Sequence, residues 1–228
     1  GLEDGASVAI LINDELVVDL WGGVADPATG APWQEDTICC LFSATKTMSA
    51  LCMLTLADRG LIDMDAPVAE YWPEFSANGK DGVLVRHVLA HTAGLPGWTE
   101  SVTFDDLYDT RGAAAALAEQ APWWEPGTAA GYHAVTQGYL LGELVLRVTG
   151  ESLGTFFRTT FAEPLGAEYH IGTGPELDAR IAPIIPPTNV LGGRSTPGSI
   201  GERALNNPVI DAAVAELRCD ALIVRLDA

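Results

Sequence analysis

The feature that most constrains the fold of this 228-residue chain is a change of hydrophobic period near residue 43. Before that point, two Val- and Ile-rich runs, 7–12 and 15–21, meet at Asn13-Asp14, which is typical of a β-hairpin. A third apolar run, 37–41, predicts a short buried strand. After that point apolar residues recur at helical spacing, over segments 43–60, 83–90, 112–120, 134–148 and 152–162. Strands followed by helices predict an α+β fold, with a small antiparallel sheet beside a mostly helical part.

Turn and cap residues divide the chain into three parts. Residues 1–62 hold the strands and the first long helix, 63–181 form a helical domain, and 182–228 are loop-rich because Pro and Gly are frequent there. We expect Gly60 and Gly150 to end helices, Ser152 to cap one, and Asp65 to cap a short helix. So few strands cannot cover that many helices. Either the sheet is small, or strands outside the chain or at 221–226 complete it.

The charge of the chain is strongly negative. Twelve Lys and Arg residues against 31 Asp and Glu residues give a formal net charge of −19. Such a surface repels phosphate backbones and anionic lipids, so we expect neither nucleic acid nor a membrane as a partner. Apolar runs also fall short of the roughly 20 residues that span a bilayer. Only two of the basic residues are lysines, Lys46 and Lys80, so each of them needs an explanation.

The cysteines and the first residues bear on localisation. Cys39 and Cys40 are adjacent and Cys52 follows later, a spacing that fits neither a disulfide framework nor a CxxC metal site. We therefore expect buried free thiols and a reducing, cytoplasmic setting. The chain begins at Gly1 without Met, which leaves a removed signal peptide open.

Lys46 stands three residues after Ser43, at the predicted start of the first long helix. The i, i+3 spacing places the hydroxyl and the amine on one helix face. At a helix N-terminus, free N–H groups favour the negative charge that develops on a serine nucleophile and on an acyl oxygen. A lysine among apolar neighbours is poorly hydrated, which helps it to accept a proton. The pair is a candidate nucleophile and base, and the alternative is a serine cap with a surface lysine.

Tyr132 is the candidate for a second proton-transfer group. It lies in the turn-rich stretch 124–132, just before the predicted helix 134–148, so its ring is not committed to a helix face. A tyrosine near a cationic lysine has its phenolate favoured, which makes it a candidate base. On its own, a tyrosine in a loop is an ordinary surface or packing residue.

At this point the sequence resembles a known family. The resemblance rests on Ser43-x-x-Lys46, on the Trp-x-Pro-Gly-Thr-x3-Tyr run that ends at Tyr132, on the helix with Gly138-Tyr139-Leu140-Leu141-Gly142, and on His91-Thr92-Ala93-Gly94-Leu95. Together these motifs resemble the serine β-lactamase-related superfamily, and most of all the family VIII carboxylesterases. The resemblance implies a β-lactamase or penicillin-binding-protein-like fold, a serine acyl-enzyme mechanism, and no metal or organic cofactor.

The resemblance assigns a role to each matching residue. Ser43 would attack an ester carbonyl and supply one oxyanion-hole donor from its backbone N–H. Lys46 would assist the deprotonation of Ser43, and Tyr132 would be the base for acylation and the proton donor to the leaving alcohol. We expect His133 and Trp124 in the pocket wall, with His133 alternatively on the surface. The lactamases carry asparagine two positions after the tyrosine, where this chain has Ala134. This difference favours an ester hydrolase that acts on small carboxylic esters over a β-lactamase.

Two parts of the resemblance fall short. The third motif of the superfamily, Lys-Thr-Gly or an equivalent, has no match, because Lys80 is in the wrong part of the chain and the family pattern fades near residue 210. The early Trp21-Gly22-Gly23 lies on a strand and does not take that role. Truncation is therefore expected, or completion of the site by a second copy in a homo-oligomer. A penicillin-reactive protein and a catalytically incomplete interaction domain stay open as alternatives.

One further pattern has the spacing of a metal site. His87 and His91 are four residues apart, as in some zinc proteins, but the glutamate of H-E-x-x-H and a third ligand are missing nearby. We expect no metal here, and the resemblance places His91 in a structural loop.

Overall fold

The computed structural model describes residues 4–185, 196 and 198–207. Within these residues the sheet has three antiparallel strands in the order β1 (Gly5–Ile12), β2 (Glu15–Asp26) and β3 (Ala31–Pro32). Asn13 and Asp14 both have positive φ, +50° and +66°, as the tight turn of a two-residue hairpin requires. The predicted hairpin is confirmed, and a bulge between Ile10 and Leu11 interrupts its register.

The predicted strand at 37–41 is wrong. Ile38 forms one isolated parallel bridge with Ile181, and the third strand of the sheet is the short β3 instead. Cys39 and Leu41 are exposed rather than buried. The run is apolar, but it crosses from the sheet to the first long helix, and among the described residues the bridge to Ile181 is its only strand-like pairing. Hydrophobicity alone therefore misassigned a connection as a strand.

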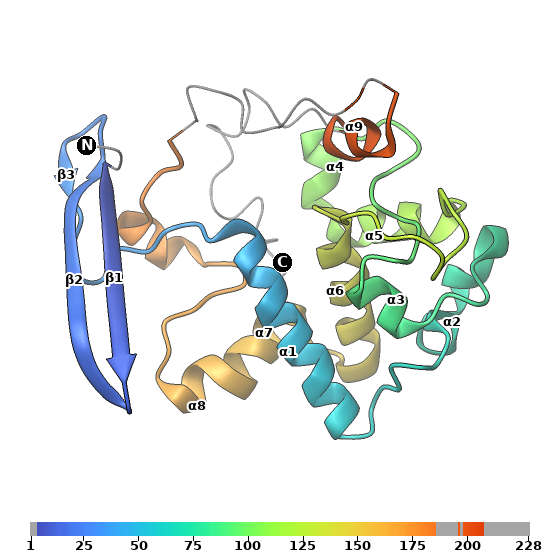
Figure 1. Cartoon of the computed structure of the whole chain (residues 1–228), viewed down its shortest axis with the longest axis horizontal. Coiled ribbons are helices and arrows are strands. Elements are labelled where there is room, and N and C mark those ends of the chain that lie inside the picture. Colours follow the sequence, from blue (N-terminus) through green and yellow to red (C-terminus); the bar gives the residue numbers. More distant parts are fainter. Residues whose placement is uncertain (1–3, 186–195, 197, 208–228) are drawn as a thin grey trace.

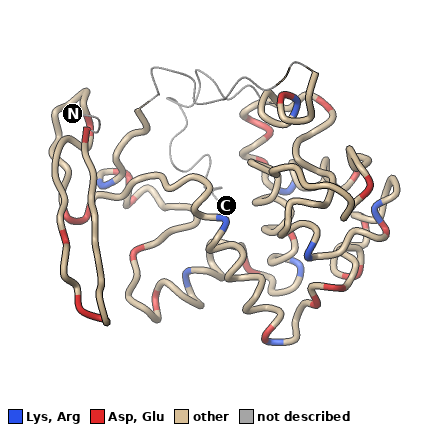
Figure 2. Tube along the Cα trace, in the orientation of Figure 1, with Lys and Arg blue, Asp and Glu red and all other residues tan. Residues whose placement is uncertain are grey.

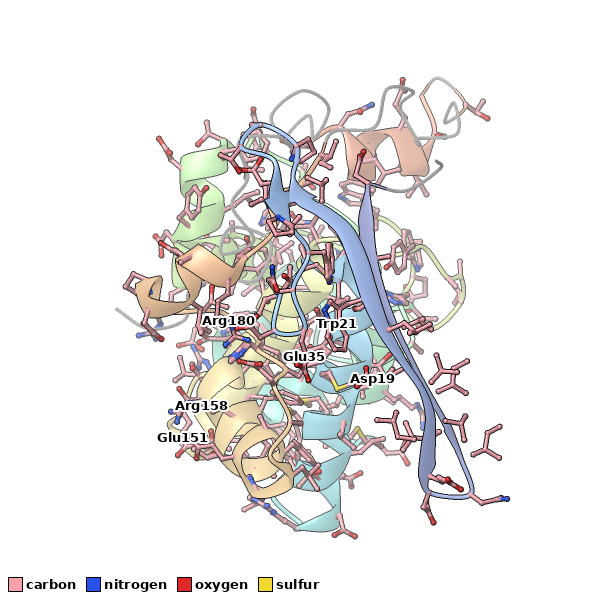
Figure 3. The ribbon with its side chains drawn as sticks, turned by 90° about the vertical axis from the view of Figure 1, so that its left-hand side faces the viewer. Asp19, Trp21, Glu35, Glu151, Arg158 and Arg180 are labelled. Atoms are coloured by element: carbon pink, nitrogen blue, oxygen red, sulfur yellow. The ribbon has the colours of Figure 1, made fainter. Side chains whose placement is uncertain are left out.

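The hairpin presents apolar side chains to solvent. It lies at one end of the molecule, beside the helical part (Figure 1), and Figure 3 views its outer side with Asp19 and Trp21 labelled. Leu11 and Leu20 are 63% and 62% exposed. Other exposed apolar residues of β1 and β2 are Val8, Ile10, Ile12, Leu16, Val17 and Trp21. An apolar surface of this kind is uncommon on a soluble domain and marks a place where further chain or a partner can pack.

The core is helical and is built around α1 (Thr45–Asp58) and α6 (Thr136–Thr149). One side of α1 is buried at Cys52, Met53 and Leu56, whereas Leu54 is 57% exposed. This helix is therefore buried along one side, and not on most sides as its many apolar residues suggest. The remaining helices are short and surround these two (Figure 1): α2 (Val68–Tyr71), α3 (Val85–Leu89), α4 (Phe104–Tyr108), α5 (Thr110–Glu119), α7 (Leu153–Phe157), α8 (Glu163–Leu165) and α9 (Ile200–Leu205).

Most of the predicted helix ends are confirmed. After α1, the Gly60 N–H donates to the Ala57 carbonyl and the Leu61 N–H to the Leu56 carbonyl, the paired bonds of a Schellman motif with Gly60 at φ +67°. Gly150 ends α6 in the left-handed conformation. The Ser152 hydroxyl caps α7 by accepting from the Thr155 N–H at 3.1 Å.

Three local predictions need correction. Asp65 does not cap α2, because that helix begins only at Val68, and the Asp65 carboxylate instead pairs with Arg86. The helix predicted to close before Pro164 continues through a π turn (Arg158–Ala162) into α8, with Pro164 in its first turn. The segment after 181, which we expected to be loop-rich, also contains the helix α9, while the predicted strand at 221–226 lies outside the described residues.

The second lysine has a structural explanation. Lys80 has no exposed surface, and its ammonium donates to the carbonyls of Ala77 and Gln120, so it joins the loop before α3 to the end of α5. Its Nζ also lies 5.5 Å from the centre of the Phe75 ring. Burial lowers the pKa of Lys80.

The many acidic residues are spread over the hairpin and the helical part alike (Figure 2).

Candidate active site

Ser43 lies on a sharp turn between the extended chain and α1. It is the middle residue of the 3₁₀ turn η1 (Phe42–Ala44), which precedes α1 directly. Phe42 has φ +46°, a left-handed conformation that costs about 1–2 kcal/mol for a residue with a side chain. The Ala44 N–H closes the turn on the Leu41 carbonyl at 3.1 Å. This geometry leaves Ser43 exposed at the start of a helix.

Lys46 lies between Ser43 and the segment before α6. Its Nζ is 3.4 Å from Ser43 Oγ and 2.6 Å from the carbonyl oxygen of Ala134. The predicted i, i+3 pair therefore forms, with α1 beginning at Thr45, two residues later than expected. The bond to Ala134 orients the amine and leaves it in contact with the serine hydroxyl.

Tyr132 contacts the same lysine, Lys46, through its ring. The Lys46 Nζ lies 5.1 Å from the centre of the Tyr132 ring, within the range of a cation–π contact. Tyr132 is 52% exposed, and its ring packs edge-on against His91 with centroids 4.9 Å apart. The structure thus brings together the three residues that the sequence nominates for catalysis.

His133 and Trp124 lie behind the tyrosine rather than in the pocket wall. His133 has no exposed surface, its Nε2 accepts from the Leu95 N–H, and burial lowers its pKa to about 4. Trp124 is half-buried with its ring edge-on to His133 at 6.2 Å. Neither residue is among the lining residues of the pocket beside Ser43, where we expected them, and Tyr132 is absent from that lining as well. The fully buried position of His133 also excludes the surface alternative.

An open pocket adjoins Ser43 and Lys46. It encloses about 690 Å³ of space, including its mouth. Sequence reasoning missed most of its other lining residues: Phe42, Thr45, Ser49, Leu107, Val135, Gln137, Gly138 and Tyr139. Ser49 stands one helical turn after Lys46, a spacing that could have identified it. Leu107 comes from a distant segment with no local signal. The apolar members leave room for a small acyl or alcohol group.

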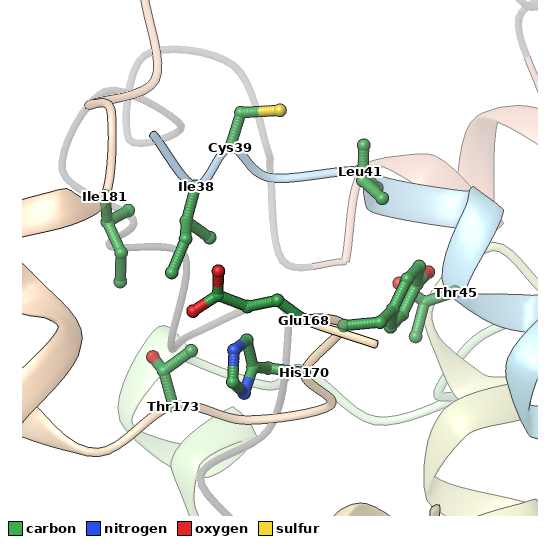
Figure 4. Close-up of a pocket in the computed structure, with 9 residues that line it drawn as sticks. Ile38, Cys39, Leu41, Thr45, Glu168, His170, Thr173 and Ile181 are labelled. Carbon is green, nitrogen blue, oxygen red and sulfur yellow. The ribbon is translucent and has the colours of Figure 1, made fainter. Parts of the chain in front are cut away.

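A second pocket of about 430 Å³ lies on the sheet side of Thr45 (Figure 4). Cys39, His170 and Thr173 are among its lining residues. The buried Oγ1 of Thr173 and Nε2 of His170 have no hydrogen-bond partner among the described residues. Glu168, also in its wall, is held by Arg180, and this bond lowers the pKa of the carboxyl. No pattern in the sequence marked this pocket.

The described residues contain no group of three or more His, Cys, Asp or Glu side chains that could hold a metal ion. His87 and His91 both use Nδ1 to accept backbone N–H groups, from Leu84 and His133. The expectation of buried thiols holds for Cys52 but is wrong for Cys39, which is exposed. Among the described residues, no helix is long and apolar enough to cross a membrane.

The α+β fold, with a small antiparallel sheet beside many helices, is shared with a solved family VIII carboxylesterase and a solved penicillin-binding protein homologue. The chain belongs to the beta-lactamase family, because residues 2–200 match its family model.

Two curated relatives are esterases by name. The esterase/beta-lactamase LipL of Mycobacterium tuberculosis is 44% identical over 188 residues, which make up 82% of this chain and 43% of that protein. Esterase EstB of Burkholderia gladioli is 32% identical over 179 residues, which make up 71% of this chain and 45% of that protein. The chain therefore spans somewhat less than half the length of these relatives.

Solved structures confirm the predicted fold. A family VIII carboxylesterase superposes with a TM-score of 0.85 at 44% identity, over 95% of this chain and 58% of the other. A penicillin-binding protein homologue from Caulobacter crescentus superposes with a TM-score of 0.81 at 39% identity, over 93% of this chain and 56% of the other. The resemblance to family VIII carboxylesterases inferred from the motifs is thus confirmed.

Proposed function

We propose that this chain carries the catalytic serine of a hydrolase that cleaves small carboxylic esters through an acyl-enzyme on Ser43. The observation that carries the proposal is the Lys46 Nζ at 3.4 Å from the Ser43 Oγ, beside an open pocket with apolar walls. An amine in this position can take the serine proton as the hydroxyl attacks. The esterase names of the two curated relatives support the same reaction class.

The proposed reaction has two steps. Ser43 Oγ attacks the ester carbonyl while its proton passes to Lys46, and the backbone N–H of Ser43 stabilises the oxyanion. The Tyr132 hydroxyl then gives a proton to the departing alcohol and is left as a phenolate, with the Lys46 Nζ 5.1 Å from the centre of its ring. In the second step water attacks the acyl-enzyme, the same groups move its protons in reverse, and the carboxylic acid leaves.

A second candidate function is reaction with β-lactams. It is favoured by the name of the Mycobacterium tuberculosis relative, which includes beta-lactamase, and by a beta-lactamase of Escherichia coli that is 29% identical over 161 residues. Residue 134 distinguishes the two candidates. Its side chain is a methyl group, and its contact with Lys46 is made by the backbone carbonyl. A side-chain amide that could hold the substrate is therefore missing at this position, so we rank ester hydrolysis first.

The test is active-site labelling together with turnover. The purified chain should release a burst of nitrophenol from p-nitrophenyl acetate, and a fluorophosphonate should add one adduct that peptide mass spectrometry places on Ser43. Ser43→Ala should lose both signals, whereas Ser101→Ala, an exposed serine outside the pocket, should keep them. A folded chain that gives neither a burst nor a label on Ser43 would refute the proposal. A stable penicillin adduct without ester turnover would favour the second candidate.

A further inference from the structure

The loop that follows α3 packs against the loop that carries Tyr132. It is formed by residues 91–95, which belong to the motif His-Thr-Ala-Gly-Leu. His91 has φ +60°, a conformation that is rare for a residue with a side chain and that turns its carbonyl and its ring toward the tyrosine loop. A strained backbone at this point indicates that the surrounding contacts hold it there.

His91 contacts the tyrosine and both of its neighbours. Its carbonyl oxygen accepts the Gly131 N–H at 3.0 Å, and its Nδ1 accepts the His133 N–H at 3.1 Å. Its ring lies edge-on against Tyr132 with centroids 4.9 Å apart. One residue therefore holds the backbone before and after Tyr132 as well as the tyrosine ring itself.

The second histidine completes the arrangement. His133 Nε2 accepts the Leu95 N–H at 3.1 Å, which assigns the ring proton to Nδ1 and directs it to the Gly131 carbonyl at 2.6 Å. The hydrogen bond from the Leu95 N–H to His133 and the one from the His133 N–H to His91 both require an accepting ring nitrogen that carries no proton. Burial lowers the pKa of His91 and of His133, and the nearby Lys46 charge acts in the same direction.

We propose that His91 is the positioning residue of Tyr132, and that it keeps the phenol beside Lys46 by holding Gly131 and His133. The inference rests on the proposed function, because only there does Tyr132 transfer a proton. The groups that face His91 are Lys46, Tyr132 and His133. Protonation of His91 at Nδ1 would place this N–H against the backbone N–H of His133, which would break the hydrogen bond and release the loop that carries Tyr132.

The test combines two His91 variants with a double-mutant cycle. His91→Ala removes the ring acceptor, whereas His91→Asn keeps an acceptor and tolerates positive φ. We expect His91→Ala to lower kcat for p-nitrophenyl acetate about tenfold or more with KM nearly unchanged, and His91→Asn to recover most of it. In a Tyr132→Phe background, His91→Ala should cause no further loss, because the two residues act as one unit.

A readout without turnover separates this inference from the proposed function. In protein with ¹³C-labelled tyrosine rings, Tyr132→Phe identifies the resonance of Tyr132. His91→Ala should shift or broaden that resonance, His91→Asn should restore it, and His87→Ala should leave it in place. His87 is the matched control, because its Nδ1 also accepts a backbone N–H, from Leu84. An unmoved Tyr132 resonance in His91→Ala, or an equal loss of kcat in both backgrounds, would overturn the inference even if esters are turned over.

Discussion

Replacing each of the two lysines by methionine should separate catalysis from stability. Lys46→Met keeps the apolar stem but removes the amine 3.4 Å from the Ser43 Oγ. Loss of a positioned proton acceptor typically lowers the rate by about 10²–10⁴-fold, or about 3–5 kcal/mol in the activation free energy. The stability cost is small, since the Ala134 carbonyl is only half-buried and water can replace the lysine, which leaves a loss of under about 1 kcal/mol.

Lys80→Met should have the opposite effect. Lys80 is fully buried and donates to the carbonyls of Ala77 and Gln120, which lose their partner in the variant. Each carbonyl left unsatisfied costs about 1–3 kcal/mol, and the apolar methionine recovers part of this, so we expect a net loss of about 2 kcal/mol. For a chain of this size that lowers Tm by about 4–8 °C. Lys80 does not line the pocket beside Ser43, so kcat per folded molecule should be the same as in the wild type.

The two variants are compared in one assay set. Nitrophenol release, normalised to the folded fraction from circular dichroism, gives kcat, and thermal unfolding gives Tm. Lys46→Met should lose at least about 99% of kcat with Tm close to that of the wild type. The reasoning is refuted if Lys46→Met keeps more than about a tenth of the rate, or if Lys80→Met lowers kcat per folded molecule as much as Lys46→Met does.

Three other predictions concern residues around the site. Because the folded pKa of His133 is about 4 and its unfolded value is near 6.5, the unfolded chain binds more protons below pH 6.5. Stability from this residue is complete above pH 6.5 and falls by up to about 3 kcal/mol as the pH drops to 4, and urea titrations at several pH values should show a shallower loss in His133→Gln. Gly138 lines the pocket, and apart from its chain neighbours and the nearby backbone of α6 no described atom lies within 4 Å of the position that a Cβ would take there. Gly138→Val should therefore lower turnover of p-nitrophenyl butyrate more than that of the acetate, by about tenfold. Gly142→Val, one turn further along α6 and outside the pocket, should leave the ratio of the two rates unchanged. Gly60→Ala should cost about 1 kcal/mol in chemical denaturation, since Gly60 adopts φ +67°, and an unchanged midpoint would contradict the Schellman assignment.

Local signals explain what could be predicted. The hairpin follows from two residues, Asn13 and Asp14, that tolerate positive φ between β-branched runs. The contact between Ser43 and Lys46 follows from helical geometry over a single turn. In each case the interacting groups are within a few residues of one another, so the backbone conformation alone determines that they meet.

Burial was harder to predict, because it depends on what covers a residue. Leu54 and the apolar residues of the hairpin have the hydrophobicity of core positions, but the described residues leave them exposed. His133 shows the opposite error. It is polar and follows an exposed tyrosine, but both of its ring nitrogens have a partner in a fully buried position, because Nε2 accepts from the Leu95 N–H and Nδ1 donates to the Gly131 carbonyl. The residue type sets the free-energy cost of exposing an apolar side chain or of burying a polar one. Only the tertiary structure determines which side chains are exposed and which are buried.

The site itself depends on contacts that no local pattern contains. Lys46 is held by the carbonyl of Ala134, 88 residues away, and Tyr132 by His91 on a third segment. These segments meet because α1 packs against α6, and the tyrosine loop enters α6 directly. A change in the packing of the two helices would therefore move the lysine and the tyrosine relative to each other. For this reason a core substitution between α1 and α6 can impair the reaction without touching Ser43, Lys46 or Tyr132, whereas an equally costly one in the hairpin turn should lower stability alone.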